Sequence, residues 1–249
     1  MTLGVASTNN VSPLALDERA RIHHAVARSA IFRDLPPPAI DDIASRVTMR
    51  RALGGQAVLS QDEAGDALYL LMAGRVKIVM FGDSGGEVTL AVLRPGDIFG
   101  EMSLFDGHAR SANVVALEPA TALALARQPL LEHLRAYPQT AFHLLSELSR
   151  RLRRADETIA EMALCDVEDR LIRRLVQLAK EDGGELPEGL IIRRRPKQQD
   201  LANMVGSCRE TISRTFNQLV RKGLIVPRGR SLVVTRRLIS TLESPAKAA

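Results

Sequence analysis

The 249-residue sequence contains no tryptophan, only 3% aromatic residues and only two cysteines. Cys165 and Cys208 lie far apart and form no Cys-x-x-Cys pair, so neither a disulfide framework nor a cysteine-bound metal is predicted. The scarcity of aromatic side chains disfavours binding of single-stranded nucleic acid, which depends on stacking of bases on aromatic rings. Binding of duplex DNA has no such requirement.

Long apolar runs are also missing. No window approaches the roughly 18 consecutive apolar residues of a membrane span, and the N-terminus lacks the basic and apolar regions of a secretory signal. The five histidines share no metal-ligand spacing, and the sequence has neither a nucleophile and base pair nor a Walker-type phosphate loop. We therefore expect a cytoplasmic protein that binds no membrane and no metal, has no catalytic residues and is not an enzyme.

The net charge of +5 is unevenly distributed. Residues 166–249 hold 17 of the 34 Lys and Arg but only 10 of the 29 Asp and Glu, a net charge of +7, whereas residues 1–165 carry −2. A basic excess confined to the C-terminal part indicates that this part meets a polyanion. The length is sufficient for two domains, each with its own core.

The apolar pattern of the N-terminal part changes from helical to strand-like. Helices are expected from Leu14 to about Ser29 and, after a proline-rich break, to about Arg46. Several short strands at close spacing then predict a β-sandwich or β-roll, so the fold class is α+β. The clearest of these apolar runs, separated by glycine turns, are 67–72, 76–80 and 88–93.

A regular apolar seam follows in the next helical segment. Its steps alternate between 4 and 3 residues, the spacing of the a and d positions of a coiled coil. This seam predicts a helix that pairs with a second copy of the chain in a homodimer; the alternative is a long helix packed on its own domain. The seam residues are Ala141, Leu145, Leu148, Leu152, Ala155, Ile159 and Met162.

The basic C-terminal part has the pattern of a winged helix-turn-helix. Asp166 can cap a helix that runs to about Lys180, which places a hinge at Cys165. Pro196 is expected as the first residue of a later helix, Gly206 as a turn and Ser207 as the cap of a second helix. A hairpin with a basic tip completes the unit. The expected divisions are a flexible tail over 1–20, an effector domain over 21–137, a dimerisation helix over 138–164 and a DNA-binding domain over 165–249.

The second helix of this unit carries polar side chains that can contact bases in the major groove. Arginine can bond guanine with two donors, glutamate can accept from cytosine, and serine can do either. The alternative is an ordinary solvated helix face. The candidates for base contact are Arg209, Glu210, Ser213 and Arg214. Contacts to phosphates, which position a protein without specifying sequence, are assigned to Lys197, Gln199, Thr211, Arg228 and Arg230.

These residues resemble the catabolite activator and fumarate-nitrate regulator family of transcription regulators, and the resemblance extends from about Ile31 to Val234. Residues 205–211 are similar to the cyclic AMP receptor branch and residues 210–214 to the anaerobic-regulator branch. The resemblance implies a dimer that binds a palindromic, TGTGA-like site in double-stranded DNA and has RNA polymerase as a partner. It also implies that the arginines and the glutamate named above touch bases.

Residues 96–104, followed by Arg110-Ser111-Ala112, are similar to the phosphate-binding cassette of cyclic-nucleotide domains. Glycine lets a phosphate approach the backbone at a helix start, glutamate can accept from the ribose 2′-hydroxyl, and arginine supplies a planar cation for the cyclic phosphate. The alternative is a pair of strand turns with a surface ion pair between Glu101 and Arg110. The nucleotide-binding candidates are Gly100, Glu101, Met102, Ser103, Arg110, Ser111 and Asp156.

The identity of the ligand is left open at this point. Where the cyclic AMP receptor has a Thr-Ser pair that meets adenine, the matching residues here are Ala155 and Asp156. Ala155 has no polar group, and Asp156 could accept from the amine of adenine or guanine alike. Cyclic AMP is the expected ligand. The alternative is a regulator that binds DNA without a cyclic nucleotide or responds to another ligand, such as a cyclic dinucleotide.

Overall fold

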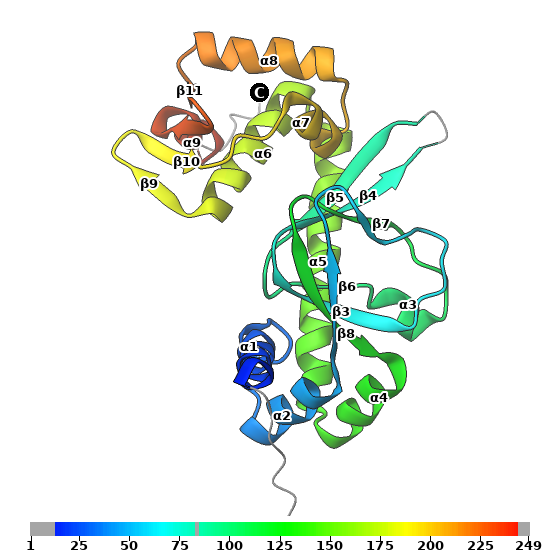
Figure 1. Cartoon of the computed structure of the whole chain (residues 1–249). Coiled ribbons are helices and arrows are strands. Elements are labelled where there is room, and N and C mark those ends of the chain that lie inside the picture. Colours follow the sequence, from blue (N-terminus) through cyan, green and yellow to red (C-terminus); the bar gives the residue numbers. More distant parts are fainter. Residues whose placement is uncertain (1–12, 83–84, 244–249) are drawn as a thin grey trace, which may run out of the picture. The chain divides into compact units, whose positions relative to one another are not determined.

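The computed structural model describes residues 13–82 and 85–243. They form two compact units, shown in Figure 1. The first takes in the described residues up to Val79 and Val92–Arg150, and the second takes in Met80–Ala91 and the residues from Arg151 on. Of the tail expected over 1–20, residues 1–12 lie outside the described residues, and those from Pro13 on belong to the first helix.

Eight short strands form two four-stranded sheets, which confirms the predicted β-roll. The orders are β1-β8-β3-β6 in one sheet and β2-β7-β4-β5 in the other. Leu123 on the central β8 pairs with Met49 of β1 and Leu70 of β3, in antiparallel register. The strands are β1 (Thr48–Ala52), β2 (Ala57–Leu59), β3 (Ala67–Ala73), β4 (Val76–Phe81), β5 (Glu87–Leu93), β6 (Ile98–Phe99), β7 (Asn113–Ala116) and β8 (Ala120–Ala126).

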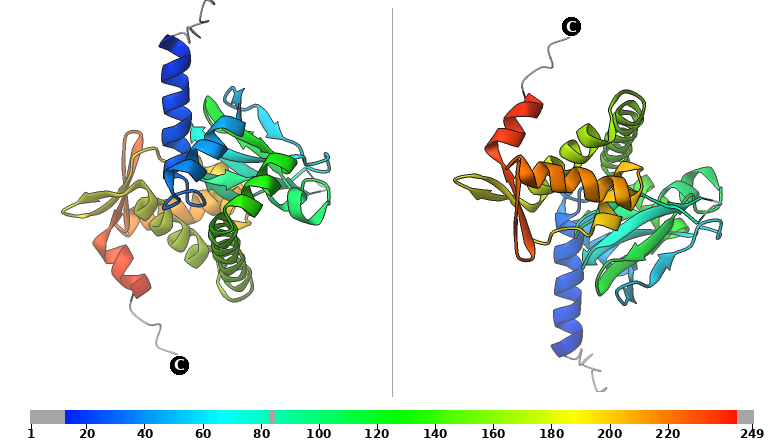
Figure 2. Two further views of the ribbon diagram at one scale, coloured as in Figure 1. Left: turned by 90° about the horizontal axis from the view of Figure 1, so that it is seen from below. Right: turned by 90° about the horizontal axis from the view of Figure 1, so that it is seen from above.

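Helices cover the first of these sheets and close the core of the first unit (Figure 2). Phe32 and Ile43 pack with Leu68 of β3 and Leu125 of β8, and all four are almost fully buried. Along each strand, every second residue belongs to this core, as expected for a strand with one face toward the core. The helices of this unit are α1 (Pro13–Arg28), α2 (Pro37–Arg46), α3 (Met102–Asp106), α4 (Arg127–Ala136) and the first half of α5 (Gln139–Leu164).

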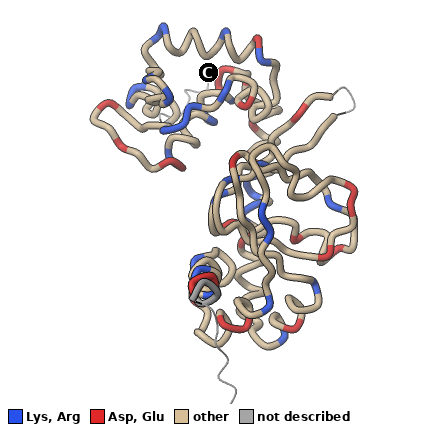
Figure 3. The backbone as a smooth tube through the Cα atoms, viewed as in Figure 1, with Lys and Arg blue, Asp and Glu red and all other residues tan. Residues whose placement is uncertain are grey.

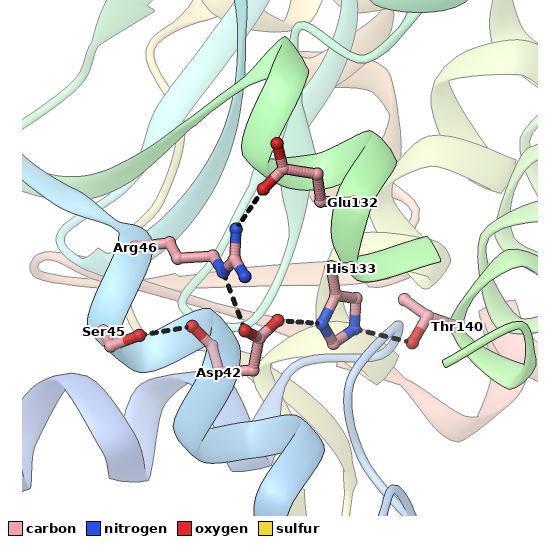
Figure 4. A network of polar contacts seen from close by, with 6 residues as sticks. All are labelled: Asp42, Ser45, Arg46, Glu132, His133 and Thr140. Atoms are coloured by element: carbon pink, nitrogen blue, oxygen red, sulfur yellow. Dashed lines mark hydrogen bonds and ion pairs between the residues drawn. The ribbon is translucent and has the colours of Figure 1, made fainter. Parts of the chain in front are cut away.

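A buried histidine joins three of these helices (Figure 4). His133 of α4 is fully buried; its Nδ1 lies 2.8 Å from Asp42 Oδ2 on α2 and its Nε2 lies 2.9 Å from Thr140 Oγ1 on α5. A neutral imidazole fits both partners, because Nδ1–H then donates to the carboxylate and Nε2 accepts from the hydroxyl. Arg46 bonds Asp42 as well and reaches Glu132. The network therefore fixes the ends of α2, α4 and α5 against one another.

Two pKa values in this network are shifted. Burial lowers the pKa of His133 below its usual value of 6.5, and the hydrogen bond to Asp42 offsets this only in part. For Asp42, burial alone would raise the pKa, but the hydrogen bonds from His133 and Arg46 outweigh it and hold the pKa of this carboxyl below its usual range. The folded state thus favours the neutral histidine and the ionised aspartate.

The second unit has its own core around α6. This helix begins where predicted, because Asp166 Oδ1 accepts from the Asp169 backbone N–H at 2.8 Å, and it ends at Gly183 with φ of +64°. Leu171 and Leu175 on its buried face pack with the helix-turn-helix and a four-stranded sheet of order β11-β12-β10-β9. The elements are α6 (Val167–Asp182), β9 (Gly184–Leu186), β10 (Gly189–Ile192), α7 (Gln198–Val205), α8 (Arg209–Arg221), β11 (Ile225–Arg228), β12 (Ser231–Thr235) and α9 (Arg236–Glu243).

Two predicted helix starts in this unit are wrong by one or two residues. Pro196 precedes α7 instead of opening it, because Lys197 is extended and its N–H donates to Asp200 Oδ2 at 3.2 Å. Ser207 does not cap α8; its N–H donates to Ala202 O and closes the end of α7, and Cys208 is the capping residue. Both errors are shifts of one or two residues at a helix start, which the sequence pattern does not resolve.

We expect the substitution His133→Gln to flatten the pH dependence of stability. Because folding lowers the pKa of His133, the stability it confers is fully present above about pH 6.5 and is lost as the pH falls below that value, by at most about 1.4 kcal/mol per pH unit. Urea denaturation between about pH 7.5 and about pH 5.5 measures the slope. His24→Gln, at an exposed histidine, should keep the wild-type slope. Equal slopes for wild type and His133→Gln would contradict the assignment.

Candidate functional site

The predicted phosphate cassette takes in β6, the turn at Gly100 and Glu101 and the start of α3, and Arg110 follows in the loop before β7. Gly100 has φ of +76°, a conformation that side chains rarely adopt, and a Cβ there would lie 2.8 Å from Arg110 Nη1. Glu101 follows and is only 4% exposed, although it stands beside the start of a surface helix. A glycine is therefore required at position 100, because the backbone has a positive φ and because Arg110 leaves no space for a Cβ.

Arg110 is buried as deeply, at 4% exposure. Its Nη1 donates to Gly100 O, its Nη2 donates to Ala67 O at 3.0 Å, and its backbone N–H donates to Glu63 O at 2.8 Å. The surface location that the alternative gave to Glu101 and Arg110 is wrong, because both side chains are buried. Five N–H donors are available on a guanidinium, so an arginine held by two carbonyls can still donate to a phosphate.

The other cassette candidates differ in exposure. Ser103 is 4% exposed, whereas Met102 is 52% exposed and Ser111 is exposed, with its Oγ 3.7 Å from Met102 Sδ. Gly65 lies against this group, since a Cβ on it would stand 2.8 Å from Arg110 Cζ. Asp156, the seventh candidate, is an exposed residue of α5 and belongs to the second unit.

The base-contacting candidates share one face of α8. Ile212, Phe216 and Leu219 on the opposite face are buried in the core of the second unit, which fixes the rotation of the helix. The right-hand view of Figure 2 shows α8 lengthwise, with the β11 and β12 hairpin beside it. One shallow depression is lined by Gln198, Arg209, Glu210, Ser213, Arg214 and Asn217.

Two polar side chains are in contact at the start of α8. Cys208 Sγ lies 3.1 Å from Thr211 Oγ1, and this hydrogen bond lowers the pKa of the Cys208 thiol, while the carboxylate of Glu210 acts in the opposite direction. Thr211, a phosphate candidate, is half-buried, and its hydroxyl is engaged with Cys208. Gln198 was not foreseen beside the base-contacting set, because only the packing of α7 against α8 brings it there.

Four of the phosphate candidates are exposed. Figure 3 shows that Lys and Arg recur along the chain of the second unit. Lys197 and Gln199 lie at the start of α7, and Arg228 and Arg230 lie at the tip of the wing. Arg228 has an ion pair that the sequence did not indicate, 2.8 Å from Glu188 Oε1. The exposed arginines 193–195, in the segment before α7, are further cations near the helix-turn-helix that the prediction omitted.

An apolar stripe runs along α5, but it differs from the predicted seam. Of the predicted residues, Leu145, Leu152, Ile159, Met162 and Ala155 are exposed. Leu148 is half-buried and packs against the core of the first unit, so its side chain serves that core, as in the alternative interpretation. Phe142, 69% exposed, was missed. It stands one turn before Leu145. The positions seven and fourteen residues later hold the polar Ser149 and Asp156, so the apolar pattern of the sequence does not include Phe142.

Within residues 13–82 and 85–243, no three His, Cys, Asp or Glu side chains are grouped so that they could hold a metal ion. None of the helices in the described part of the chain has the length and apolar character to span a membrane.

The fold and the two sites define a class of protein, a DNA-binding transcription regulator with a cyclic-nucleotide-binding domain. Residues 49–137 match the model of the cyclic nucleotide-binding domain, and residues 169–238 match that of the Crp-like helix-turn-helix domain. The chain belongs to the CRP/FNR family of transcription regulators. Members of this family regulate transcription and are not enzymes.

Curated relatives cover most of the chain. It is 30% identical to the CRP-like cAMP-activated global transcriptional regulator of Mycobacterium tuberculosis, over 84% of this chain and 94% of the relative. It is 34% identical to the cyclic AMP receptor protein of Thermus thermophilus, over 79% and 88%. Among solved structures, the c-di-GMP-responsive global regulator CLP of Xanthomonas campestris is 25% identical, with a TM-score of 0.72 over 80% of this chain and 99% of that one.

Proposed function

We propose that the protein is a homodimeric transcription regulator of the cytoplasm whose affinity for a palindromic, TGTGA-like DNA site is controlled by a cyclic nucleotide, with cyclic AMP as the first candidate. RNA polymerase is the expected protein partner. The observation that carries the proposal is the buried Arg110 beside the left-handed Gly100. A buried cation next to a glycine is suited to bind a compact anion such as a cyclic phosphate.

Each cassette residue has a role in this proposal. Arg110 and Ser111 donate to the cyclic phosphate, and Glu101 accepts from the ribose 2′-hydroxyl. Ser103, buried beside Gly65, supports the turn, and the exposed Met102 borders the site. Asp156 on α5 is assigned to the exocyclic amine of the base, which leaves adenine and guanine both acceptable.

The choice of cyclic AMP rests on relatives that are named as cyclic AMP-activated or cyclic AMP-binding regulators. One observation favours a second candidate, because a structural neighbour of 25% identity is described as c-di-GMP responsive. Ala155 also offers no polar atom to a base. The alternative is therefore a regulator of the same DNA-binding type that responds to a cyclic dinucleotide or binds DNA without a ligand.

Control by a ligand requires that the ligand favour the DNA-competent arrangement over the other. We assign the coupling to α5, which starts in the unit that holds the cassette and ends in the unit that holds α8. Leu145, Leu152, Ile159 and Met162 on its exposed stripe are the proposed contacts with a second copy. Pairing of this stripe would bury apolar surface that is otherwise in water, and it would give two recognition helices for the two half-sites.

Titration with cyclic AMP should raise the affinity of the wild-type protein for its operator, which selection from random duplexes can supply. Arg110→Lys should lose most of this response, because an ammonium cannot donate two parallel hydrogen bonds to one phosphate. Arg127→Lys, at an exposed arginine, is the matched control and should respond as the wild type does. Fluorescence anisotropy of labelled operator measures the response. No response to cyclic AMP, cyclic GMP or cyclic di-GMP would rule out the proposed control.

Arg209→Ala and Lys197→Ala should separate base contact from phosphate contact. Arg209→Ala is expected to cost about 1–3 kcal/mol on the operator and to relax discrimination at one base pair, with little effect on random DNA. Lys197→Ala should weaken both DNAs alike and reduce the slope of log K against log salt by about 0.9. Competition binding at several salt concentrations tests this. If the two variants lose affinity for operator and random DNA in the same proportion, the assignment is wrong.

Leu152→Glu should convert the dimer into monomers. Leu152 is 63% exposed on the apolar stripe, so a glutamate there would place two like charges across the proposed interface. Arg153→Glu alters an exposed neighbour off the stripe and should leave the dimer intact. Sedimentation velocity distinguishes the two species, and circular dichroism shows that the fold is retained. A Leu152→Glu protein that sediments as the wild type does would exclude this face.

A further inference from the structure

Tyr69 lies beneath the charged group of the cassette. It occupies the middle of β3 and pairs with Phe99 of β6 in the antiparallel register. The two rings stack, with centroids 5.2 Å apart and planes inclined by 14°. The Cζ atom of Arg110 stands over the Tyr69 ring, 5.8 Å from its centroid. The buried guanidinium thus packs on the ring of Tyr69, and the ring of Phe99 stacks on that of Tyr69.

The same strand holds the guanidinium through its backbone. Ala67 O, two residues before Tyr69 on β3, accepts from Arg110 Nη2 at 3.0 Å. Gly65 and Gly100 approach the cation so closely that a Cβ on either would stand 2.8 Å from one of its atoms. The ring of Tyr69 therefore packs on a guanidinium whose position is already restricted by neighbouring backbone atoms.

The two carbonyl acceptors restrain the edge of the guanidinium, and the ring of Tyr69 adds a contact on its face. A ring face attracts a cation through its quadrupole and favours one stacked orientation, and the attraction increases as the cation loses water. Arg110 is 4% exposed, so this attraction acts in a setting with little water. Orientation matters here because donation to a phosphate through two parallel N–H groups depends on the plane of the guanidinium.

We propose that Tyr69, braced by Phe99, is a positioning residue that holds Arg110 in the orientation needed to bind the anionic group of the ligand. The ring face, not the hydroxyl, performs this role. The inference rests on the proposed function, because it names how that site holds its anion. Tyr69 itself does not touch the phosphate; it acts through Arg110.

The test uses the full-length protein with substitutions at position 69. Tyr69→Phe retains the ring and should bind cyclic AMP within about twofold of the wild type, whereas Tyr69→Leu should bind about 3- to 30-fold more weakly. Progressive fluorination of a phenylalanine at position 69 should weaken binding stepwise, because fluorine withdraws charge from the ring face at nearly constant shape. Tyr137→Leu, at the other tyrosine of the chain, controls for a general loss of stability. Calorimetric titration with cyclic AMP gives the affinities.

A second measurement needs no ligand. The Nε–H resonance of Arg110 in nitrogen-15 spectra should shift and exchange faster with water in Tyr69→Leu, and it should stay unchanged in Tyr69→Phe and Tyr137→Leu. An unchanged resonance in Tyr69→Leu, or equal affinity across the fluorinated series, overturns the proposal. If the wild type binds none of cyclic AMP, cyclic GMP and cyclic di-GMP while the resonance responds as expected, the proposed function fails and the positioning of Arg110 by Tyr69 stands.

Discussion

The burial of one positive charge organises the β-roll. A guanidinium removed from water is costly unless carbonyls, rings or anions replace its hydration. Around Arg110 the chain supplies two carbonyl acceptors, at Gly100 and Ala67, and the face of Tyr69. Gly65 and Gly100 are glycines because any side chain there would occupy the space of the guanidinium. The cassette, β3 and the loop before β7 are thus tied to one side chain, and that side chain is the one suited to hold an anion.

The second unit meets a different requirement, which is to hold α8 firmly while leaving one of its faces in water. Its buried face packs on α6 and the small sheet through Ile212, Phe216 and Leu219. Arg170 of α6 fastens the neighbouring turn, because its Nε donates to Val205 O at 3.0 Å and its Nη1 donates to Cys165 O at 2.8 Å. One arginine therefore connects the end of α7 with the segment that joins α5 to α6. The polar face of α8, with the proposed base contacts, stays outside this core.

Much of this architecture was predictable because local rules and tertiary packing agree. The capping of α6 by Asp166 and the turn at Gly206 depend on a few neighbouring residues, and both lie where the sequence placed them. The exact start of a helix was less predictable. Ser207 was expected to cap α8, but α8 begins one residue later, with Cys208 as its N-cap. In the cassette, the alternative placed Glu101 and Arg110 at the surface, and only the tertiary structure showed that both are buried.

The sequence by itself determined the succession of a strand-rich part, a long helix and a winged helix-turn-helix, because periodicity, glycine turns and charge depend on neighbouring residues. The resemblance of its motifs indicated the class of protein. Only the tertiary structure decided which apolar residues of α5 face the core and which face water. Leu148 and Phe142 are both apolar, yet one packs on the first unit and the other is exposed. It likewise decided that Tyr69 lies under Arg110, 41 positions later in the chain. Contacts between strands and distant loops depend on how the sheets are paired, and no local pattern encodes that pairing.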